Sequence, residues 1–216
     1  MSSGRARMMV LVTSCLCLAG CTVTPRESSS PVQSPSASPL LTDIERTKAL
    51  GTSVIDVTLT VDGSLKLSGH GTVDLAKGLG LVTWTDASGT RTELINDRGD
   101  YIRTDQWAKV PTSTNRALAD PLADLGQLTN LETRLAPCGR DTCTSYRGTL
   151  PASTFPSPGN VHIDADGAVN VRVDVDERGR ISTITRMAGP AALVVHLHDF
   201  GGPLDLTAPS LSPSAE

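Results

Sequence analysis

The chain has 216 residues, of which 38% are hydrophobic and 3% aromatic, and its formal net charge is −4. This length suits one domain with a substantial core. The acidic balance without a basic cluster argues against binding to nucleic acid or adhesion to anionic lipid head groups.

The first 20 residues are laid out like a secretory signal. Arg5 and Arg7 supply positive charge, and the apolar run Met8–Leu18 that follows is too short to span a bilayer as a helix, which takes about 20 residues. The run ends in Leu18-Ala19-Gly20-Cys21, which resembles the bacterial lipobox. The sequence therefore predicts cleavage before Cys21; the alternative is ordinary secretion with cleavage near Ala19.

Lipidation of Cys21 is the predicted means of membrane attachment. In lipoproteins of this kind the cysteine thiol receives a diacylglyceryl group, and two or more chains, such as palmitate, anchor firmly at about 0.8 kcal/mol per buried methylene. Without the signal, 17 basic residues stand against 23 acidic ones, a net charge near −6. The lipid is therefore the expected membrane contact, on the extracytoplasmic face of the cell membrane.

The remaining chain divides by composition. Residues 21–42 are rich in Ser and Pro and predict a tether, 43–209 a single domain, and 210–216 a disordered tail. With Cys15 and Cys17 in the signal and Cys21 lipidated, Cys138 and Cys143 are left to form a disulfide in an oxidising compartment. The rival interpretation, a metal or redox site, lacks further Cys ligands or the C-x-x-C spacing.

The domain begins with a short predicted helix, Asp43–Leu50, with Thr42 as its N-cap and Gly51 after its end. A second helical pattern, Asn115–Leu128, is interrupted by Pro121 and predicts two short pieces or a kink. Period-two alternation and turn residues predict nine to eleven strands. They are Ser53–Val61, Leu65–Ala76, Gly80–Thr85, Arg91–Asn96, Tyr101–Thr104, Leu131–Ala136, Thr142–Leu150, Val169–Val175, Ile181–Arg186, Ala192–Asp199 and Leu204–Leu206.

Three hairpin motifs and the order of the parts resemble a known family. The motifs are 96–102 followed by Trp107, Val173–Ile181, and Asp199–Leu204 before Ala208-Pro209. Together with the lipobox, the tether and the short helix before a long first strand, they are similar to the actinobacterial lipoproteins of the mycobacterial LppX/LprG kind, whose architecture is shared with the carrier LolA.

This resemblance implies a mainly β (α+β) fold: a curved antiparallel half-open β-barrel with short capping helices. It also implies an apolar cavity that takes the acyl chains of lipids or glycolipids. The residues expected to line this cavity alternate on two strands: Ile55, Val57, Leu59, Val171, Val173 and Val175. The segment Pro151–Asn160 stands where the family has a longer lid helix, and its prolines predict no helix of useful length.

Other candidate sites have plainer interpretations. His196 and His198 share a strand face but have no third local metal ligand, so solvent-facing histidines are favoured. Asp164–Gly167 resembles the start of a calcium loop but lacks its distal acid, so a turn is favoured. Gly69-His70-Gly71 predicts a bulge or bend. The aromatics Trp84, Trp107 and Tyr101 are expected to pack in the core or to contact a ligand.

The predicted function is lipid binding or shuttling by a membrane-anchored lipoprotein, without catalysis or cofactor. No G-x-S-x-G, H-E-x-x-H or phosphate-binding glycine loop occurs in the sequence, so no catalytic residue is nominated. The alternative is an envelope interaction or sensor module that uses the same half-barrel as a platform; an envelope hydrolase is a distant third.

Overall fold

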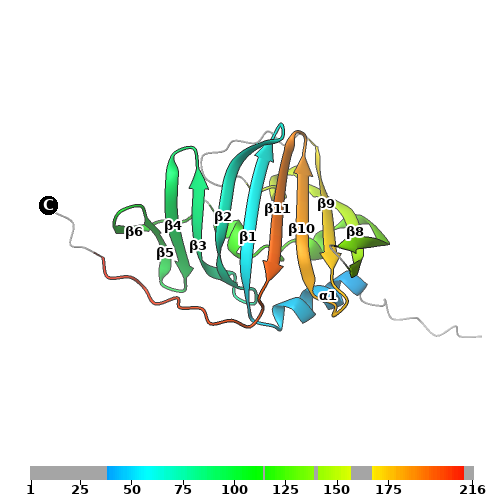
Figure 1. The fold of residues 1–216 in the computed structure, drawn as a ribbon, viewed down its shortest axis with the longest axis horizontal. Coiled ribbons are helices and arrows are strands. Elements are labelled where there is room, and N and C mark those ends of the chain that lie inside the picture. The colour runs from blue at the N-terminus through cyan, green and yellow to red at the C-terminus, as the bar shows by residue number, and fades with distance from the viewer. Residues whose placement is uncertain (1–37, 114, 139–140, 157–166, 212–216) are drawn as a thin grey trace, which may run out of the picture. The chain divides into compact units, whose positions relative to one another are not determined.

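A computed structural model describes residues 38–113, 115–138, 141–156 and 167–211, with the side chains of 138 and 141 left out. Eleven antiparallel strands form one sheet in the order β6-β5-β4-β3-β2-β1-β11-β10-β9-β8-β7 (Figure 1). The strands are β1 Thr52–Val61, β2 Ser64–Asp74, β3 Leu79–Asp86, β4 Gly89–Asn96, β5 Gly99–Arg103, β6 Trp107–Val110, β7 Thr129–Cys138, β8 Asp141–Pro151, β9 Ala168–Val175, β10 Ile181–Ala188 and β11 Ala191–His198. The helical elements are α1 Pro39–Lys48, α2 Arg116–Ala119, and the 3-10 turns η1 Leu125–Gln127 and η2 Ala152–Thr154.

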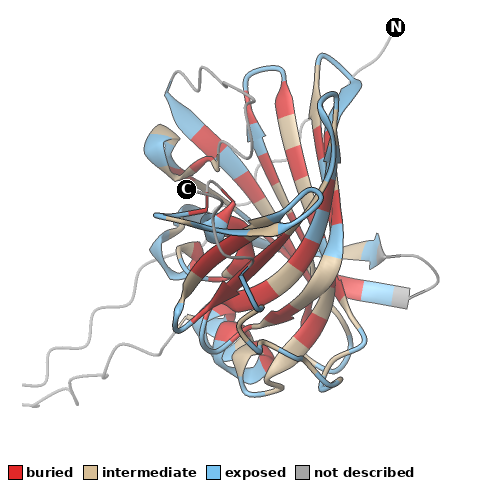
Figure 2. Ribbon diagram, turned by 90° about the vertical axis from the view of Figure 1, so that its left-hand side faces the viewer, coloured by how far each residue is buried: buried red, intermediate tan, exposed pale blue. Residues whose placement is uncertain are grey.

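The sheet consists of two meanders joined at its centre. Strands β1 to β6 run outward in one direction and β11 to β7 in the other, and β1 pairs with β11 along its length. Figure 2 shows the sheet curving around its buried face, and strands β6 and β7 form its two edges. The predicted curved, half-open antiparallel barrel is confirmed.

This topology dictates where one connection must run. Strands β6 and β7 are consecutive in sequence but lie at opposite edges of the sheet. Residues 111–128, here named the crossing segment, must therefore pass from edge to edge. They contribute buried side chains to the same core as the strands, so the segment crosses the concave face.

Alternation decides which side chains face inward. In β1, Ile55, Val57 and Leu59 are at most 1% exposed, whereas Thr58 between them is exposed. Because successive strand residues point to opposite faces, the apolar set lies on the concave face and the polar set on the convex face. The same pattern holds in β9 and β11.

Helix α1 differs from the prediction at its start. It begins at Pro39, four residues before the predicted Asp43, and no side chain caps its first turn. Proline suits the first helical position because its missing N–H has no intrahelical partner there. The earlier start brings Leu40 into the helix, where it is buried together with Ile44.

Two further segments, one near the C-terminus and one at an edge of the sheet, also differ from prediction. The predicted strand Leu204–Leu206 is wrong: this part of the chain is extended without belonging to the sheet. Thr52 Oγ1 donates a hydrogen bond to the Gly202 carbonyl at 2.5 Å, and Asn96 Nδ2 donates to the Leu206 carbonyl at 2.9 Å. These contacts hold the segment across the ends of β1 and β4. Strand β6, conversely, was not predicted.

Candidate functional site

The concave face is apolar over most of its strands. The six residues predicted to line a cavity, Ile55, Val57, Leu59, Val171, Val173 and Val175, lie on it and are at most 3% exposed. They pack in one cluster with side chains of α1 and the crossing segment. Protein side chains therefore cover this part of the face, and a ligand has to displace some of them; contact with a ligand stays a prediction.

Two elements cover the concave face, helix α1 and the crossing segment, and together they are here named the cover. Helix α1 is held on the sheet by polar contacts. The Tyr146 hydroxyl on β8 donates to Asp43 Oδ2 at 2.9 Å. The backbone N–H of Ile181 donates to Thr47 Oγ1 at 2.9 Å. Burial, together with the Asp43 carboxylate, raises the pKa of Tyr146 to about 12, so the hydroxyl keeps its proton and remains a donor.

The crossing segment forms the other part. Its leucines Leu118, Leu122 and Leu125 are at most 2% exposed, as their helical spacing predicted, and the break around Pro121 is confirmed because α2 and η1 are separate short pieces. This segment therefore covers apolar surface without forming a long helix of its own.

A buried ion pair holds the crossing segment against β10. The Arg186 guanidinium donates to both oxygens of Asp124, at 2.7 and 2.6 Å. It also donates to the carbonyls of Pro121 and Thr154, each at 3.2 Å. Its side chain is only 6% exposed, so one arginine joins the crossing segment and η2 to the inside of the sheet.

A second polar group fixes the start of the crossing segment. Glu93 on β4 is 1% exposed and accepts hydrogen bonds from Ser113 Oγ at 2.5 Å and Asn115 Nδ2 at 2.8 Å. It also accepts from Arg91 Nε at 3.1 Å. On β5, Asp100 accepts from the Ser113 backbone N–H at 2.6 Å and pairs with Arg116. The concave face is therefore apolar over most strands but charged at β4 and β5.

The contacts that Arg186 and Glu93 make with the crossing segment were not predicted from the sequence. Arg186 and Asp124 are 62 residues apart, and Glu93 lies about 20 residues before its partners. A local signal for Arg186 does exist, since a charged residue occupies an inward position of an alternating strand.

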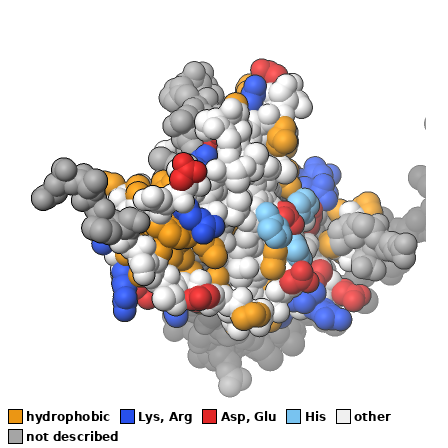
Figure 3. Space-filling view, turned by 60° about the vertical axis from the view of Figure 1, so that its left-hand side comes forward, with side chains coloured by type: hydrophobic (Ala, Val, Ile, Leu, Met, Phe, Trp, Pro, Cys, Tyr) orange, Lys and Arg blue, Asp and Glu red, His pale blue; other side chains and the backbone are white. Residues whose placement is uncertain are grey.

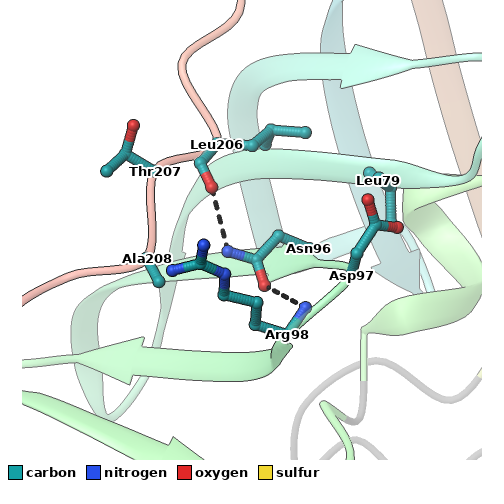
Figure 4. Close-up of a pocket in the computed structure, with 7 residues that line it drawn as sticks. All are labelled: Leu79, Asn96, Asp97, Arg98, Leu206, Thr207 and Ala208. Atoms are coloured by element: carbon teal, nitrogen blue, oxygen red, sulfur yellow. Dashed lines mark hydrogen bonds between the residues drawn. The ribbon is translucent and has the colours of Figure 1, made fainter.

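Open grooves occur on other parts of the surface. One, of about 290 Å³, lies between the C-terminal segment and the β4–β5 turn and is lined by Leu79, Asn96, Asp97, Arg98, Leu206, Thr207 and Ala208 (Figure 4). Asn96 bridges it, since its Oδ1 accepts from the Arg98 backbone N–H at 2.9 Å and its Nδ2 donates to Leu206. The groove is formed where the C-terminal segment packs on the β4–β5 turn, and its lining residues Leu79 and Leu206 also contact the apolar core.

The convex face carries a histidine–aspartate network. Asp56 accepts from His70 Nδ1 at 2.7 Å and His198 Nε2 at 2.8 Å, and His198 Nδ1 lies 2.9 Å from Asp199 Oδ2. The hydrogen bond to Asp56, and then that to Asp199, raise the pKa of His198. Figure 3 shows histidine and acidic side chains side by side on this face.

His196 does not join this network but contacts Thr183 at 3.1 Å. The two histidines that share a strand face therefore do not converge on one position. Among the residues that the structure describes, no group of three or more His, Cys, Asp or Glu side chains is placed to hold a metal ion.

The other sequence candidates are dispersed. Trp84 is buried on the concave face, and Tyr101 is 5% exposed on β5. Trp107 lies on the edge strand β6, where the Arg103 guanidinium is 5.0 Å from its ring. Of the predicted bulge or bend at Gly69-His70-Gly71, the bulge is wrong, because the β1–β2 irregularity lies at Leu59/Thr60 and pairing through these glycines is regular; the bend stays a prediction.

Several predictions concern residues outside the described ranges. Cys21, residues 22–37 of the predicted tether and the acidic residues of Asp164–Gly167 are among them; the last four residues of the predicted tether, 39–42, lie in helix α1. Residues 157–160 of the Pro151–Asn160 segment are also outside, and its described part contains the short turn η2. Cys143 is buried on β8 and Cys138 ends β7 of the same hairpin, but the Cys138 side chain is not described. The disulfide therefore stays a prediction. In the described ranges, no helix is long and apolar enough to cross a bilayer.

Comparisons with known proteins agree on the architecture. Scans against protein-family models and curated sequences find no match. Among solved structures, lipoprotein LppX from Mycobacterium tuberculosis matches with a TM-score of 0.59 and 16% identity, covering 78% of this chain and 96% of LppX. LprF from Mycobacterium bovis matches with a TM-score of 0.58 and 16% identity, covering 82% of this chain and 98% of LprF. The chain therefore has the half-barrel fold of the mycobacterial lipoproteins of the LppX/LprG kind.

Proposed function

We propose that this protein is a lipid-anchored extracytoplasmic lipoprotein that binds, and shuttles, the acyl chains of lipids or glycolipids on the concave face of its half-barrel. The main observation behind the proposal is the largely apolar concave face, which is covered by elements that do not belong to the sheet. Covers of this kind can separate from the sheet without breaking its strand pairing.

The magnitudes are compatible with exchange of the buried leucines of the crossing segment for a ligand. Exposing the three buried leucines of the crossing segment costs roughly 1.5–3 kcal/mol each, about 5–9 kcal/mol together. Burying about 14 methylenes of one long acyl chain gains about 11 kcal/mol at about 0.8 kcal/mol each. One chain thus offsets the displaced leucines, and a second chain adds further gain.

The proposed anchor rests on the Leu18–Cys21 motif and is tested by Cys21→Ser in the full-length precursor. The variant is expected to leave the membrane fraction, because it loses the only acyl attachment that the sequence predicts. Ser14→Ala in the signal segment is the matched control and should remain with the membrane. Retention of the Cys21 variant in the membrane would contradict the proposed anchoring.

Ligand binding is tested by organic extraction of protein purified from its native host, followed by mass spectrometry. Acyl lipid in stoichiometric amount is expected, beyond that on Cys21, which stays covalently attached during extraction. A wash at high salt, which removes adventitious polar lipid, should leave the ligand bound. Protein that carries no extractable lipid, and that takes up none from acyl-lipid vesicles, would contradict the proposal.

One observation favours the alternative, an interaction or sensor module. On the edge strand β7, Leu135 is 78% exposed and Leu131 is 37% exposed. Exposed apolar side chains on an edge strand are typical of surfaces that bind a protein partner. Under this alternative, Leu135→Lys abolishes capture of an envelope partner, whereas the proposed lipid binding is unaffected by the substitution.

A further inference from the structure

The indole of Trp84 is a buried hydrogen-bond donor inside the half-barrel. Its side chain is 1% exposed, and its Nε1–H has no acceptor among the described residues. Buried donors are nearly always paired, and tryptophan usually finds an acceptor when it is buried. An unpaired donor at this position requires a physical reason.

The surrounding sheet is shaped to hold this particular ring. Gly69 is the cross-strand neighbour of Trp84 on β2, and a Cβ atom added to Gly69 would lie 2.2 Å from the ring atom Cζ3. Glycine in a strand interior gives up stability, so its presence marks a place that needs close approach. The indole ring therefore packs directly against the backbone of Gly69, and its Nε1–H is left without a hydrogen-bond acceptor among the described residues.

Trp84 lies at the boundary between two parts of the concave face. In the sheet register its neighbour beyond Gly69 is the buried Val57, on the apolar side. Its neighbour on the other side is Arg91 on β4. An amphiphile bound across this boundary would place its chains over β1 and β2 and its first polar group near Trp84.

The charges at the boundary select among possible polar groups. Arg91 is already engaged, with Asp86 at 2.5 Å and Glu93 at 3.1 Å. Two carboxylates against one guanidinium leave the local charge negative, which disfavours the carboxylate of a free fatty acid. A neutral oxygen acceptor meets no such repulsion.

We infer that Trp84 Nε1–H donates a hydrogen bond to the ester carbonyl of a neutral acyl ester lipid, which is thereby preferred over ether-linked lipids and free fatty acids. This inference rests on the proposed lipid-binding function and names its ligand class.

The test compares binding of a diacylglycerol and of the dialkyl ether analogue with equal chains to the mature domain. Wild-type protein should bind the ester roughly 2- to 10-fold more tightly, the value of one net hydrogen bond. Trp84→Phe, which keeps an aromatic ring but removes the donor, should bind both equally and keep the ether affinity of the wild type. Trp107→Phe, the same change on edge strand β6, is the matched control and should keep the preference.

A second measurement needs no folded Trp84 variant. In ¹⁵N-labelled wild-type protein, the indole N–H resonance of Trp84, assigned by comparison with Trp107→Phe, should shift on binding the ester more than on binding the ether. Binding of both lipids without preference or differential shift would overturn the role of Trp84 alone. Binding of neither lipid would overturn the proposed function itself.

Discussion

At the scale of single residues, the polar side chains inside the half-barrel act as ties between the sheet and its cover. Arg186 shows this most clearly, because its guanidinium satisfies Asp124 and two carbonyls from separate segments. Buried pairs of this kind add little over apolar packing, but removing one partner is costly because the other charge is left without compensation.

We predict that Arg186→Met lowers the free energy of unfolding by about 3 kcal/mol, measured by urea denaturation. Adding Asp124→Leu should restore part of the loss, since no buried charge then remains. Arg134→Met is the control: its partner Glu132 is exposed, and the expected cost is below about 1 kcal/mol. Equal costs for the two single variants would contradict the assignment of Arg186 as a tie.

The convex-face network makes a second prediction at this scale, on the pKa of His198. Asp56 is the first cause of its elevation and Asp199 the second. Asp56→Asn should therefore lower the pKa of His198 more than Asp199→Asn does, in an NMR titration of the imidazole protons. A pKa that is unchanged in Asp56→Asn would contradict the geometry.

The directions of the pKa shifts of His198 and Asp56 determine how the network's contribution to the stability of the fold changes with pH. The folded-state pKa of His198 is raised above 6.5, so its contribution is fully present below that pH and lost as pH rises through the folded value. The pKa of Asp56 is lowered, so its contribution is present above 3.8 and lost as pH falls through its folded value. The network therefore stabilises the folded state most between these limits.

At the scale of elements, α1 and the crossing segment differ from the strands because side-chain contacts, not backbone pairing, hold them on the sheet. Strands pair along their whole lengths, whereas α1 depends on buried Leu40 and Ile44 and on the contacts of Asp43, Arg46 and Thr47. Elements with few such contacts open locally at lower free energy than the core.

We predict that Tyr146→Phe loosens α1 selectively. Loss of the hydrogen bond to the Asp43 carboxylate should speed amide exchange in α1 roughly 10- to 150-fold, because bonds to charged groups contribute about 1.5–3 kcal/mol. Exchange in β1 and β11 should not change. The control Tyr101→Phe removes the hydroxyl of a buried tyrosine on β5, far along the sheet from α1, and should leave α1 exchange unaltered. Uniform acceleration in all elements would contradict separate opening of α1.

Local pattern predicted most elements because it reflects forces that act locally. Alternation in Ser53–Val61 and around Val173 follows from a one-sided core, and both strands are confirmed. Strand β6 escaped prediction because its four residues, Trp107–Val110, hold too few apolar positions to display a period. Leu204–Leu206 has the composition of a strand but lies past Gly201-Gly202-Pro203, and side-chain contacts hold it outside the sheet.

At the scale of the whole molecule, the topology explains the cover. Pairing of the first and last strands at the centre puts β6 and β7 at opposite edges, so residues 111–128 must cross the open face. The sequence indicated the half-barrel only by resemblance, since pairing of β1 with β11 joins residues at least 130 positions apart. The partners of Arg186 and Glu93 and the unpaired indole of Trp84 could not be predicted, because each depends on which segments become neighbours in the fold.

The proposed function requires that acyl chains occupy the concave face in place of its cover. The most direct measurement is photo-crosslinking with an acyl lipid that carries a diazirine in its chain, with labelled peptides mapped by mass spectrometry. We predict labelling of β1 and β9 at Ile55, Val57, Leu59, Val171, Val173 and Val175, suppressed by excess unlabelled lipid. Labelling confined to exposed side chains such as Leu65 and Leu135, or unaffected by competitor, would contradict the claim.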